Sequence, residues 1–469
     1  MRRTKIVATI GPASINLSIM KKLVHAGLNV VRINLSHAKL EDMETILKNV
    51  KTIRKEMKVP LPIMVDTRGP EIRVKTFKDG SAKIKKGQLF MFTAKDIEGD
   101  ENCVSFNVPE IVSCIKPGNK ILAVNGLLAF KVIEVDGENV ITRAMNSGVI
   151  SNRKSLSIPG VKFSTPYLND ADKKDILWAI KNDIEYVAAS FVNSKEDVEV
   201  LRKFIIKNGG DIKIISKVES SLGVKNLDEI IEASDGIMVA RGDLGVEVPM
   251  SKLPNIQKVM IKKSVANGKA VITATEMLES MITSNRPTRA EVSDVANAVF
   301  DGTSCVMLSG ETAAGKFPVD AVKTMACIAE ETEKHIKYAH RFVKPEINLN
   351  TIADTISHSA VSASFAHNVK AVVCFTHSGR SAGMISRFRP SVKVIGATPN
   401  EKVYRQLDLL WGVTPILTPI YNSTDEMFRI ANDIVKKSGI AKKGEAVVIT
   451  CGTPKKPGST SMIKICEIK

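Results

Sequence analysis

Short apolar runs alternate with amphipathic stretches along most of the chain. Eight of the apolar runs are rich in β-branched residues and bounded by turn residues, which is the pattern of buried strands. We expect these strands at 5–11, 29–36, 62–67, 185–192, 212–217, 236–241, 269–275 and 305–310. The stretches between them favour helices near 16–26, 39–57, 170–182, 195–208, 225–233, 252–267, 288–300 and 318–338. Eight strand–helix units predict a parallel (β/α)8 barrel.

One long segment interrupts this pattern after the third predicted strand. Between Thr67 and Asp170, turn pairs such as Asn125-Gly126 separate short alternating runs, which predicts a small all-β domain. An insertion at this point lies over the C-terminal face of the barrel, where active sites are found, so we expect it to act as a lid. A passive insertion is the alternative.

The pattern changes again after about residue 340, where further strands and helices predict a doubly wound α/β domain. Its Ser378-Gly379-Arg380-Ser381 turn precedes a helix expected from about Ala382. Backbone N–H groups, hydroxyls and an arginine at a helix start favour an anion site, and an ordinary helix cap is the alternative. We expect the loop 452–461 to close over it. The expected domains are the barrel (1–70 and 161–338), the inserted lid (71–160) and the C-terminal domain (339–469).

Composition narrows the class of protein. A chain of 469 residues is too long for a single core and predicts two to four domains. No apolar run approaches 18 residues, so no membrane span is expected. The start MRRTKIVATIGPAS enters a strand at once and has no signal-peptide pattern. The seven cysteines are scattered without a C-x-x-C pair, which favours a reducing cytoplasm over disulfides or structural zinc.

The formal net charge of +17 raises nucleic-acid binding as a hypothesis. The lysines are spread along the chain, however, and aromatic residues make up only 5% of it. No basic run is interleaved with residues that could stack on bases. We therefore expect neither a nucleic acid nor a membrane as partner, and favour anionic small molecules.

Polar and charged side chains gather at the C-terminal ends of the predicted barrel strands, which meet in one mouth. Lys217 and Glu219 project side by side from the fifth strand, because residues two apart share a face. For the same reason we expect Arg32, Asn34 and Ser36 to share one face of the second strand. A plain ion pair would explain Lys217 and Glu219 alone, but not charges at so many strand ends. The complete set is Arg32, Asn34, Ser36, Asp66, Thr67, Glu71, Arg73, Lys217, Glu219, Arg241, Asp243, Thr275, Glu276, Ser309 and Glu311.

These residue types indicate the chemistry. The carboxylates of Glu219 and Asp243 on neighbouring strand ends suit Mg²⁺. The cations Arg32, Arg73 and Lys217 suit a phosphoryl group. Together they favour phosphoryl transfer or enolate chemistry. A Mg²⁺-dependent lyase or a Schiff-base aldolase is the alternative, although an acidic neighbour holds the pKa of Lys217 up and opposes Schiff-base formation.

The segments together resemble the pyruvate kinase family, in its bacterial form without an extra C-terminal domain. The family's fold has a barrel, a β-domain inserted after the third strand and a C-terminal α/β domain, in agreement with the periodicity. Its members are usually homotetramers. The matching motifs are TKIVATIGPAS, RINLSH, DTRGPEIR, IISKVE, DGIMVARGDLGVEVP, TATEMLESM, RPTRAEVSDVANAVFDGTSCVMLSGETAAGKFP, SGRSA and RFRP.

The resemblance implies transfer of a phosphoryl group from phosphoenolpyruvate to ADP, giving pyruvate and ATP, with Mg²⁺ or Mn²⁺ and K⁺ as cofactors. It implies that Lys217 neutralises the phosphoryl group in flight, that Arg32 contacts it, and that Thr275 orients the protonation of enolpyruvate. The binding residues it implies are Ala240, Arg241, Gly242, Asp243 and Thr275 for the substrate, Glu219 and Asp243 for Mg²⁺, Asn34, Ser36, Asp66 and Thr67 for K⁺, Asn34, His37, Arg73 and Lys154 for the nucleotide, and Thr376, Ser378, Gly379, Arg380 and Ser381 for a phosphorylated effector.

Several positions depart from the family pattern, mostly in the lid and on its rim. Val124-Asn125-Gly126 stands where Asp-Asp-Gly is usual, and Ser155 stands where glycine is usual. These changes bear on nucleotide affinity and lid closure, and they are the one support for an alternative function, a non-catalytic phosphometabolite sensor. Glu71 matches the form associated with K⁺ dependence. The other departures are Arg68, Val74, Asn193 and Glu276.

Overall fold

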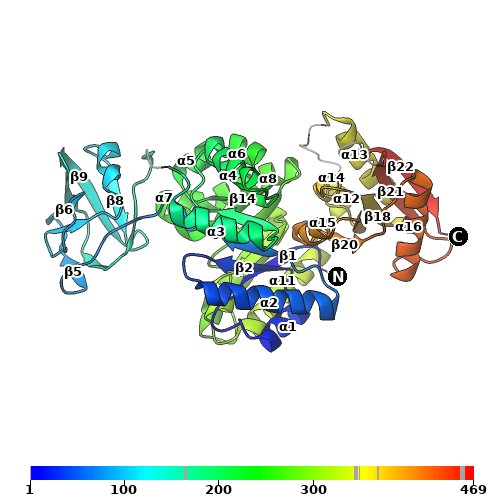
Figure 1. Cartoon of the computed structure of the whole chain (residues 1–469), viewed down its shortest axis with the longest axis horizontal. Helices are drawn as coiled ribbons and strands as arrows, with labels where there is room; N and C mark the ends of the chain where they lie inside the picture. Colours follow the sequence, from blue (N-terminus) through cyan, green and yellow to red (C-terminus); the bar gives the residue numbers. More distant parts are fainter. Residues whose placement is uncertain are drawn as a thin grey trace.

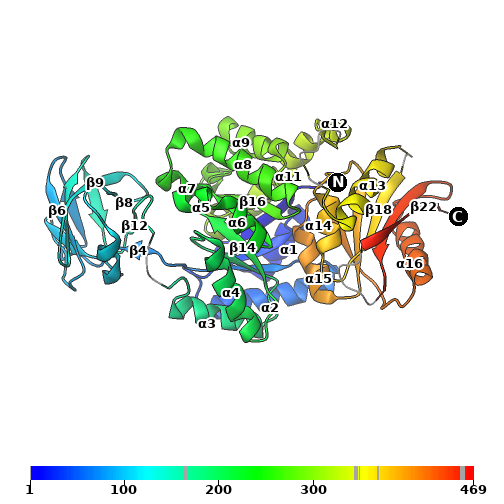
Figure 2. The same cartoon turned by 90° about the horizontal axis from the view of Figure 1, so that it is seen from above.

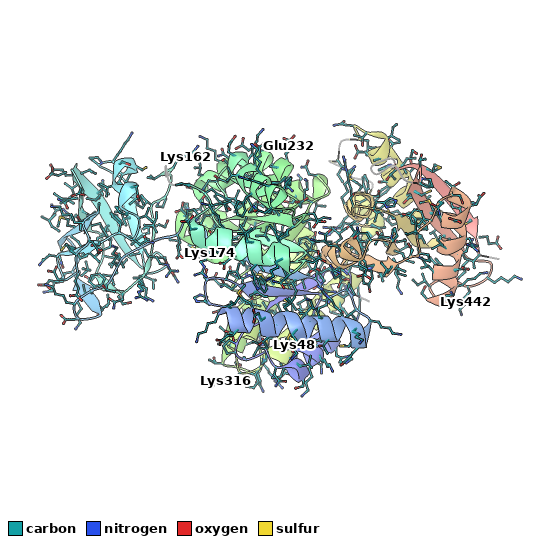
Figure 3. All side chains as sticks on the ribbon, viewed as in Figure 1. Lys48, Lys162, Lys174, Glu232, Lys316 and Lys442 are labelled. Carbon is teal, nitrogen blue, oxygen red and sulfur yellow. The ribbon has the colours of Figure 1, made fainter. Side chains whose placement is uncertain are left out.

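The computed structural model describes residues 2–162, 166–342, 347, 349–366, 369–454 and 460–468. Three bodies lie in a row in Figures 1 and 2: the inserted β-domain, the barrel and the C-terminal α/β domain. No helix in this part of the chain is long and apolar enough to cross a membrane. In Figure 3 the labelled lysines Lys48, Lys174 and Lys316 lie on the barrel and Lys442 lies on the C-terminal domain, well apart from one another.

The barrel is closed and confirms the fold expected from the hydrophobic periodicity. Its strands follow one another in the order β1-β17-β16-β15-β14-β13-β3-β2, and each pairs in parallel with its neighbours. The predicted runs overlap every one of these strands and extend a little beyond most of them. The strands are β1 (Lys5–Thr9), β2 (Val30–Asn34), β3 (Ile63–Asp66), β13 (Tyr186–Ala189), β14 (Lys213–Val218), β15 (Gly236–Ala240), β16 (Ala270–Ala274) and β17 (Cys305–Leu308).

Two apolar layers hold the barrel together. Inward side chains such as Val7, Ile215 and Met238 fill its interior, while outward ones pack beneath the surrounding helices. Helix starts follow the expected capping chemistry: the side chain of Thr288 caps α9 together with Glu291. The helices are α1 (Leu17–Ala26), α2 (Leu40–Met57), α3 (Asp170–Lys181), α4 (Lys195–Lys207), α5 (Ser221–Lys225), α6 (Leu227–Ala233), α8 (Leu253–Ala266), α9 (Arg289–Asp301) and α11 (Pro318–Lys334).

Two details at the barrel mouth differ from the periodic pattern. The second strand ends at Asn34, and the chain turns there because the N–H groups of His37 and Ala38 donate to the Asn34 carbonyl. Ser36 is therefore an exposed turn residue and does not continue the strand face of Arg32 as alternation predicted. Short helices also follow the ends of two strands, α7 (Arg241–Glu247) after β15 and α10 (Gly310–Ala313) after β17.

The inserted domain is built of strands, as predicted, around its own aromatic core. The side chains of Phe90, Phe92, Phe106 and Phe130 are fully buried, and their rings contact one another in edge-on, tilted and stacked pairs. A seven-stranded sheet has the order β4-β12-β8-β9-β10-β6-β7, and β5 pairs with β11. The strands are β4 (Ile72–Arg73), β5 (Ser81–Ile84), β6 (Leu89–Thr93), β7 (Cys103–Ser105), β8 (Lys120–Ala123), β9 (Leu128–Asp136), β10 (Asn139–Ala144), β11 (Gly148–Ser151) and β12 (Ser155–Ser157).

The C-terminal domain has a five-stranded sheet in the order β20-β19-β18-β21-β22, with only β22 antiparallel to its neighbour. Helices cover both faces, which confirms the doubly wound class. The order reverses around β18, so residues 376–381 lie at the switch point where such folds bind ligands. The elements are α12 (Tyr338–Phe342), α13 (Ile352–Ala366), β18 (Val369–Phe375), α14 (Arg380–Ser386), β19 (Lys393–Thr398), α15 (Glu401–Gln406), β20 (Val413–Leu417), α16 (Thr424–Lys437), β21 (Ala446–Gly452) and β22 (Thr460–Glu467).

The C-terminal domain closes the N-terminal end of the barrel, opposite the mouth. Lys5 at the start of β1 forms a buried ion pair with Asp408, with Nζ and Oδ1 2.7 Å apart. The hydroxyl of Tyr186 donates to the carbonyl of Gln406 at 2.5 Å. Leu409 belongs to the same apolar cluster as the barrel interior. These contacts leave the C-terminal strand ends as the open face of the barrel.

Candidate active site

Lys217 extends from the end of β14 into a buried set of polar partners. Its Nζ lies 2.9 Å from Asp66 Oδ1, 2.9 Å from Glu219 Oε1 and 2.8 Å from Ser190 Oγ. All four residues are less than 9% exposed. The pairing of Lys217 with Glu219, expected from their spacing, is present as an ion pair.

Burial and charge decide the protonation states of this cluster. Burial alone would lower the pKa of Lys217, but the negative charges of Asp66 and Glu219 outweigh it, and the pKa is raised. Burial raises the pKa of Glu219 to about 7; the charge of Lys217 opposes this shift and that of Asp243 adds to it. Lys217 therefore stays a cation at neutral pH, and a Schiff-base aldolase, which needs a neutral amine, is disfavoured.

Arg32 brings a second cation to the same carboxylate. Its Nε donates to Asp66 Oδ2 at 2.8 Å, and its Nη1 donates to Thr9 Oγ1 at 2.8 Å. Burial acts to raise the pKa of Asp66, but Arg32 and Lys217 together lower it, so this group is a carboxylate. Two fixed cations on one side of the mouth provide the field that a phosphoryl group in transfer requires.

A second cluster surrounds the start of α7. The N–H of Gly242 donates to Thr275 Oγ1 at 2.8 Å. Thr275 and Glu276 have φ angles of 66° and 52°, a strained conformation for a β-branched residue and its neighbour. Arg241 holds this turn by donating to the carbonyls of Thr275 at 2.6 Å and Glu276 at 2.9 Å, and it pairs with Asp294. These contacts commit the Arg241 side chain to the turn and to Asp294.

Glu219 and Asp243 form the carboxylate pair expected for a divalent cation. Glu219 Oε2 accepts the N–H of Phe191 at 2.8 Å, whereas its buried Oε1 is paired, among the described residues, only with the Lys217 ammonium group 2.9 Å away. Asp243 is exposed beside it at the start of α7. A buried carboxylate oxygen with an open lone pair, next to a second carboxylate, fits Mg²⁺, which takes few carboxylates and keeps several waters. In the described part of the chain no group of three or more histidine, cysteine or acidic side chains could hold a metal.

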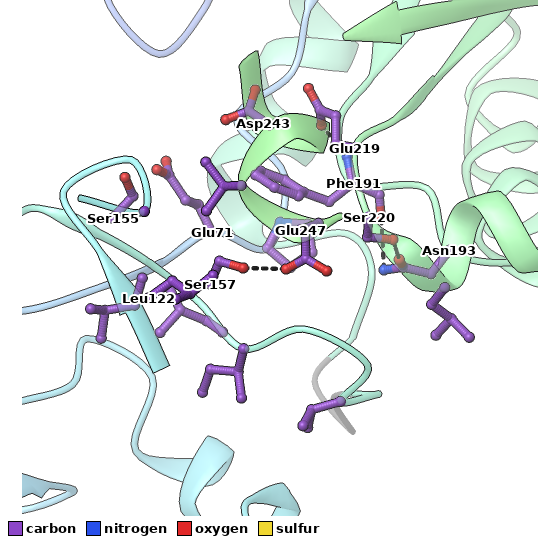
Figure 4. A pocket seen from close by; sticks show the side chains of 18 of the residues that line it. Glu71, Leu122, Ser155, Ser157, Phe191, Asn193, Glu219, Ser220, Asp243 and Glu247 are labelled. Atoms are coloured by element: carbon purple, nitrogen blue, oxygen red, sulfur yellow. Dashed lines mark hydrogen bonds between the residues drawn. The ribbon is translucent and has the colours of Figure 1, made fainter. Parts of the chain in front are cut away.

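A pocket lies between this carboxylate pair and the inserted domain (Figure 4). Glu219 and Asp243 line it from the barrel, and Ser155 lines it from the inserted domain. A hydrogen bond from Ser157 Oγ to Glu247 on α7 joins the two bodies across its edge. The inserted domain therefore borders the barrel mouth, where a lid is expected.

The four residues expected to bind K⁺ lie at the ends of β2 and β3. Asn34 and Asp66 are direct partners in the parallel ladder, and Thr67 follows at once. Ser36 lies in the turn beyond, where its N–H donates to Asn34 Oδ1 at 3.1 Å. All four supply hard oxygen atoms, the donor type that alkali and alkaline-earth cations take.

The residues expected to bind the nucleotide are divided between barrel and lid. His37 is exposed in the barrel turn, and Lys154 is exposed just before β12. Arg73 lies beside Lys154, because β4 and β12 pair. Its guanidinium group pairs with Glu71 Oε2 at 2.6 Å. The structure thus brings Arg73 and Lys154 together on the lid and leaves Asn34 and His37 on the barrel.

The expected effector-binding residues form the loop between β18 and α14. Gly379 has a φ of 83°, and its N–H donates to Thr376 Oγ1 at 2.9 Å. Arg380 is exposed, and Ser381 Oγ lies 2.5 Å from Thr460 Oγ1. A cavity lies beside this loop and is lined by Thr376, Ser378, Arg380 and Ser381. Of the loop 452–461 expected to close it, residues 455–459 lie outside the described part of the chain.

Comparison with known families decides the assignment. A family model described as pyruvate kinase, barrel domain, matches residues 1–322, and one described as pyruvate kinase, alpha/beta domain, matches residues 354–466. The chain belongs to the pyruvate kinase family. Pyruvate kinases are phosphotransferases, and this enzyme class agrees with the two cations around Asp66.

Individual pyruvate kinases match along the whole chain. One from Clostridium perfringens is 42% identical over 474 residues and covers 100% of both chains. One from Geobacillus stearothermophilus is 43% identical, and the match covers 99% of this chain and 80% of that protein. The crystal structure of a pyruvate kinase from Cryptosporidium parvum has a TM-score of 0.94 at 36% identity and covers 100% of this chain and 96% of the other.

The pyruvate kinase site also contains residues that the sequence did not point out. Ser190 contacts Lys217 and could have been found, because it is a polar residue directly after a buried strand. Asp294 holds Arg241 from α9, and Glu247 contacts the lid from α7. No local pattern distinguishes either carboxylate from an ordinary surface residue on a helix, so only the folded chain identifies them.

Proposed function

We propose that the protein transfers the phosphoryl group of phosphoenolpyruvate to ADP, with Mg²⁺ and K⁺, and then protonates enolpyruvate to pyruvate. The observation that carries the proposal is the buried set of Lys217, Arg32 and Asp66 beside the carboxylates Glu219 and Asp243. A cationic centre next to a hard-metal site matches a reaction in which charge moves between phosphate and enolate oxygens.

Lys217 and Arg32 act on the phosphoryl group. The P–O bond to the enol oxygen breaks, a bond to the terminal phosphate oxygen of ADP forms, and the charge in flight lies on the equatorial oxygens. Lys217 supplies a permanent ammonium there, because the neighbouring carboxylates keep it protonated. Arg32 is fixed by Asp66 and Thr9, so neither cation has to reorganise during transfer.

Glu219 and Asp243 would hold Mg²⁺, which when bound polarises substrate oxygens as a Lewis acid. The backbone at Ala240, Arg241 and Gly242 receives the substrate carboxylate. Thr275 stands beside this segment and orients the proton that goes to the methylene carbon. The Thr275 hydroxyl accepts the N–H of Gly242 in the structure, so the substrate carboxylate either shares this N–H with the hydroxyl or displaces it.

The remaining residues serve the second substrate and the monovalent ion. Arg73 and Lys154 on the lid contact the nucleotide phosphates, with Asn34 and His37 on the barrel side. Asn34, Ser36, Asp66 and Thr67 supply oxygens to K⁺. The lid, which we take as residues 71–160 between barrel segments 1–70 and 161–338, closes over the cavity to exclude water.

A phosphorylated metabolite regulates the enzyme through the C-terminal domain, which we take as residues 339–469. Thr376, Ser378, Gly379, Arg380 and Ser381 bind its phosphate, supported by the adjoining cavity and by the position at a sheet switch point. Resemblance to the family also supports a homotetramer, and the scattered cysteines support the cytoplasm as its location.

The test is pyruvate formation from phosphoenolpyruvate and ADP by the purified chain. The assay is run with and without Mg²⁺, with K⁺ or Na⁺, and with a panel of sugar phosphates and AMP. We expect turnover that requires the divalent ion, rises with K⁺, and responds to at least one phosphorylated compound. A folded chain that binds phosphoenolpyruvate but forms no pyruvate under any of these conditions would contradict the proposal and favour a sensor.

A further inference from the structure

Ser190 lies directly after β13, in contact with the Lys217 ammonium group. The side chain is buried, with the residue 2% exposed. Its Oγ accepts a hydrogen bond from Lys217 Nζ at 2.8 Å and lies 2.7 Å from the carbonyl of Thr67 and 3.2 Å from Asp66 Oδ1. A hydroxyl has one proton, which the shorter contact directs to Thr67. The oxygen therefore presents a lone pair to Lys217 in a fixed direction.

The backbone of Ser190 is fixed as well. Its N–H donates to Thr67 Oγ1 at 3.0 Å, and its carbonyl accepts the hydroxyl of Tyr167 at 2.9 Å. Gly69 packs so closely that a Cβ there would lie 2.9 Å from Ser190 Cβ. Gly69 and Tyr167 belong to the two chain segments that lead to and from the lid. Ser190 thus has little freedom to move away from Lys217.

The three partners of Lys217 are not equivalent. Asp66 and Glu219 are carboxylates, and their charges hold the ammonium in its buried position. Ser190 is neutral, and hydrogen bonds to charged partners are roughly twice as strong as those to neutral ones. An ammonium has three N–H donors, and three acceptor atoms already lie within 2.9 Å of this one, so an arriving phosphoryl oxygen competes with one of them. The donor that is least costly to release is the one on Ser190.

We propose that Ser190 is a positioning residue for phosphoryl transfer. Its hydroxyl oxygen orients the N–H of Lys217 that it accepts, and this N–H then passes to the phosphoryl oxygen of the substrate. The inference rests on the proposed role of Lys217. Loss of the hydroxyl leaves the charge of Lys217 in place but its direction less fixed, so the effect falls on the transition state. Binding of phosphoenolpyruvate through other groups is retained, and kcat therefore falls more than KM changes.

Ser190→Ala is compared with a matched control, Ser216→Ala. Ser216 is also a fully buried serine, on the strand that carries Lys217, but its Oγ contacts Ser234 at 2.6 Å. For both variants, kcat and KM for phosphoenolpyruvate are measured with ADP, Mg²⁺ and K⁺, and the melting temperature is recorded. Exchange of the pyruvate methyl protons in D₂O, followed by NMR with Mg²⁺, reports the protonation half of the reaction.

We expect Ser190→Ala to lower kcat by about tenfold to hundredfold, the range for a hydrogen bond to a charged group, with KM changed by less than about threefold. Methyl proton exchange should stay near the wild-type rate, because that step belongs to the Thr275 side of the mouth. Ser216→Ala should keep kcat within about twofold, while the two variants lose similar stability.

Each other outcome overturns a distinct claim. A wild-type chain without turnover contradicts the proposed function and this inference with it. An active wild type with an inactive Lys217→Met variant and a Ser190→Ala variant of normal kcat overturns the inference alone. Equal losses of kcat in the two serine variants, or a parallel loss of proton exchange in Ser190→Ala, show a structural role and also overturn it.

Discussion

The guanidinium group of Arg241 donates to Asp294 Oδ2 at 2.6 Å and so ties the start of α7 to α9. The same guanidinium group holds the carbonyls of Thr275 and Glu276, whose backbone is strained. Strain of this kind persists only where surrounding contacts over-determine it. Asp294 is none of the expected site residues, yet it fixes the clamp that shapes the turn carrying Thr275.

Asp294→Ala should therefore lower kcat/KM for phosphoenolpyruvate by about tenfold, the effect of losing one charge-assisted hydrogen bond. The buried Arg241 loses its carboxylate partner, and the turn at Thr275 relaxes. Asp301→Ala is the matched control, because Asp301 lies on the same helix and pairs with Lys258 at the surface. Steady-state kinetics of both variants check the prediction. Identical kinetic constants for the two would show that the clamp does not shape the site.

Lys217→Met should abolish phosphoryl transfer, with kcat reduced by more than about a thousandfold because a fixed transition-state charge is removed. The side chain keeps its length, but Asp66 and Glu219 lose a cation. Pyruvate formation and circular dichroism measured together separate chemistry from folding. Substantial turnover in a folded variant would remove Lys217 from the mechanism. Lys213→Met, on the same strand but at the opposite end of the barrel, is the control for losing a lysine from β14.

The barrel could be predicted from the sequence because its strands are buried on both faces and read as continuous apolar runs. The positions of Lys217 and Glu219 followed equally well, since alternation along an extended chain fixes which side chains share a face. Alternation no longer applies where the chain leaves the strand. Ser36 was expected on the face of Arg32, but the turn after Asn34 redirects it.

The rest of the site depends on contacts between distant segments, which local patterns do not encode. The family resemblance implied a role at the substrate for the backbone of Arg241. Nothing in the sequence indicated that its side chain holds Thr275, Glu276 and Asp294. The polar residue Ser190 gave a local signal, but its contact with Lys217 depends on the pairing of β13 with β14. Phe191 contacts Glu219 only through its backbone N–H. Nearly every residue type has this group, so the sequence cannot indicate the contact.

Asp172 anchors the chain segment that leads into the lid, and its loss should weaken nucleotide use. Its carboxylate accepts the N–H groups of Arg68 at 2.9 Å and Gly69 at 3.1 Å, and the side-chain amide of Asn169 at 2.8 Å. Asp172→Ala removes these contacts and loosens the segment that leads into the lid. More of the free energy of ADP binding is then used to order the lid. We expect KM for ADP to rise by roughly fivefold to tenfold, equivalent to about 1 kcal/mol, while KM for phosphoenolpyruvate changes less.

Asp175→Ala is the control for this hinge variant. Asp175 lies one turn further along α3 and pairs with the half-exposed side chain of Arg68 at 3.2 Å, a contact of little energetic weight. Its constants should match those of the wild type. Equal values of KM for ADP in both variants would indicate that the lid is positioned by other contacts, such as the bond between Ser157 and Glu247.

Arg380→Ala should remove activation by a phosphorylated metabolite and leave basal turnover unchanged. Arg380 is exposed at the cavity of the C-terminal domain, on the far side of the barrel from Lys217, so its loss does not reach the reacting groups directly. Arg429→Ala on α16 removes an equally exposed arginine of the same domain and is the control. Activation curves for each sugar phosphate and AMP check the prediction. A wild-type activation curve in the Arg380 variant would mean that the loop only caps α14. A phosphate bound there would lose a charge-assisted hydrogen bond in this variant, and activation would need a higher effector concentration.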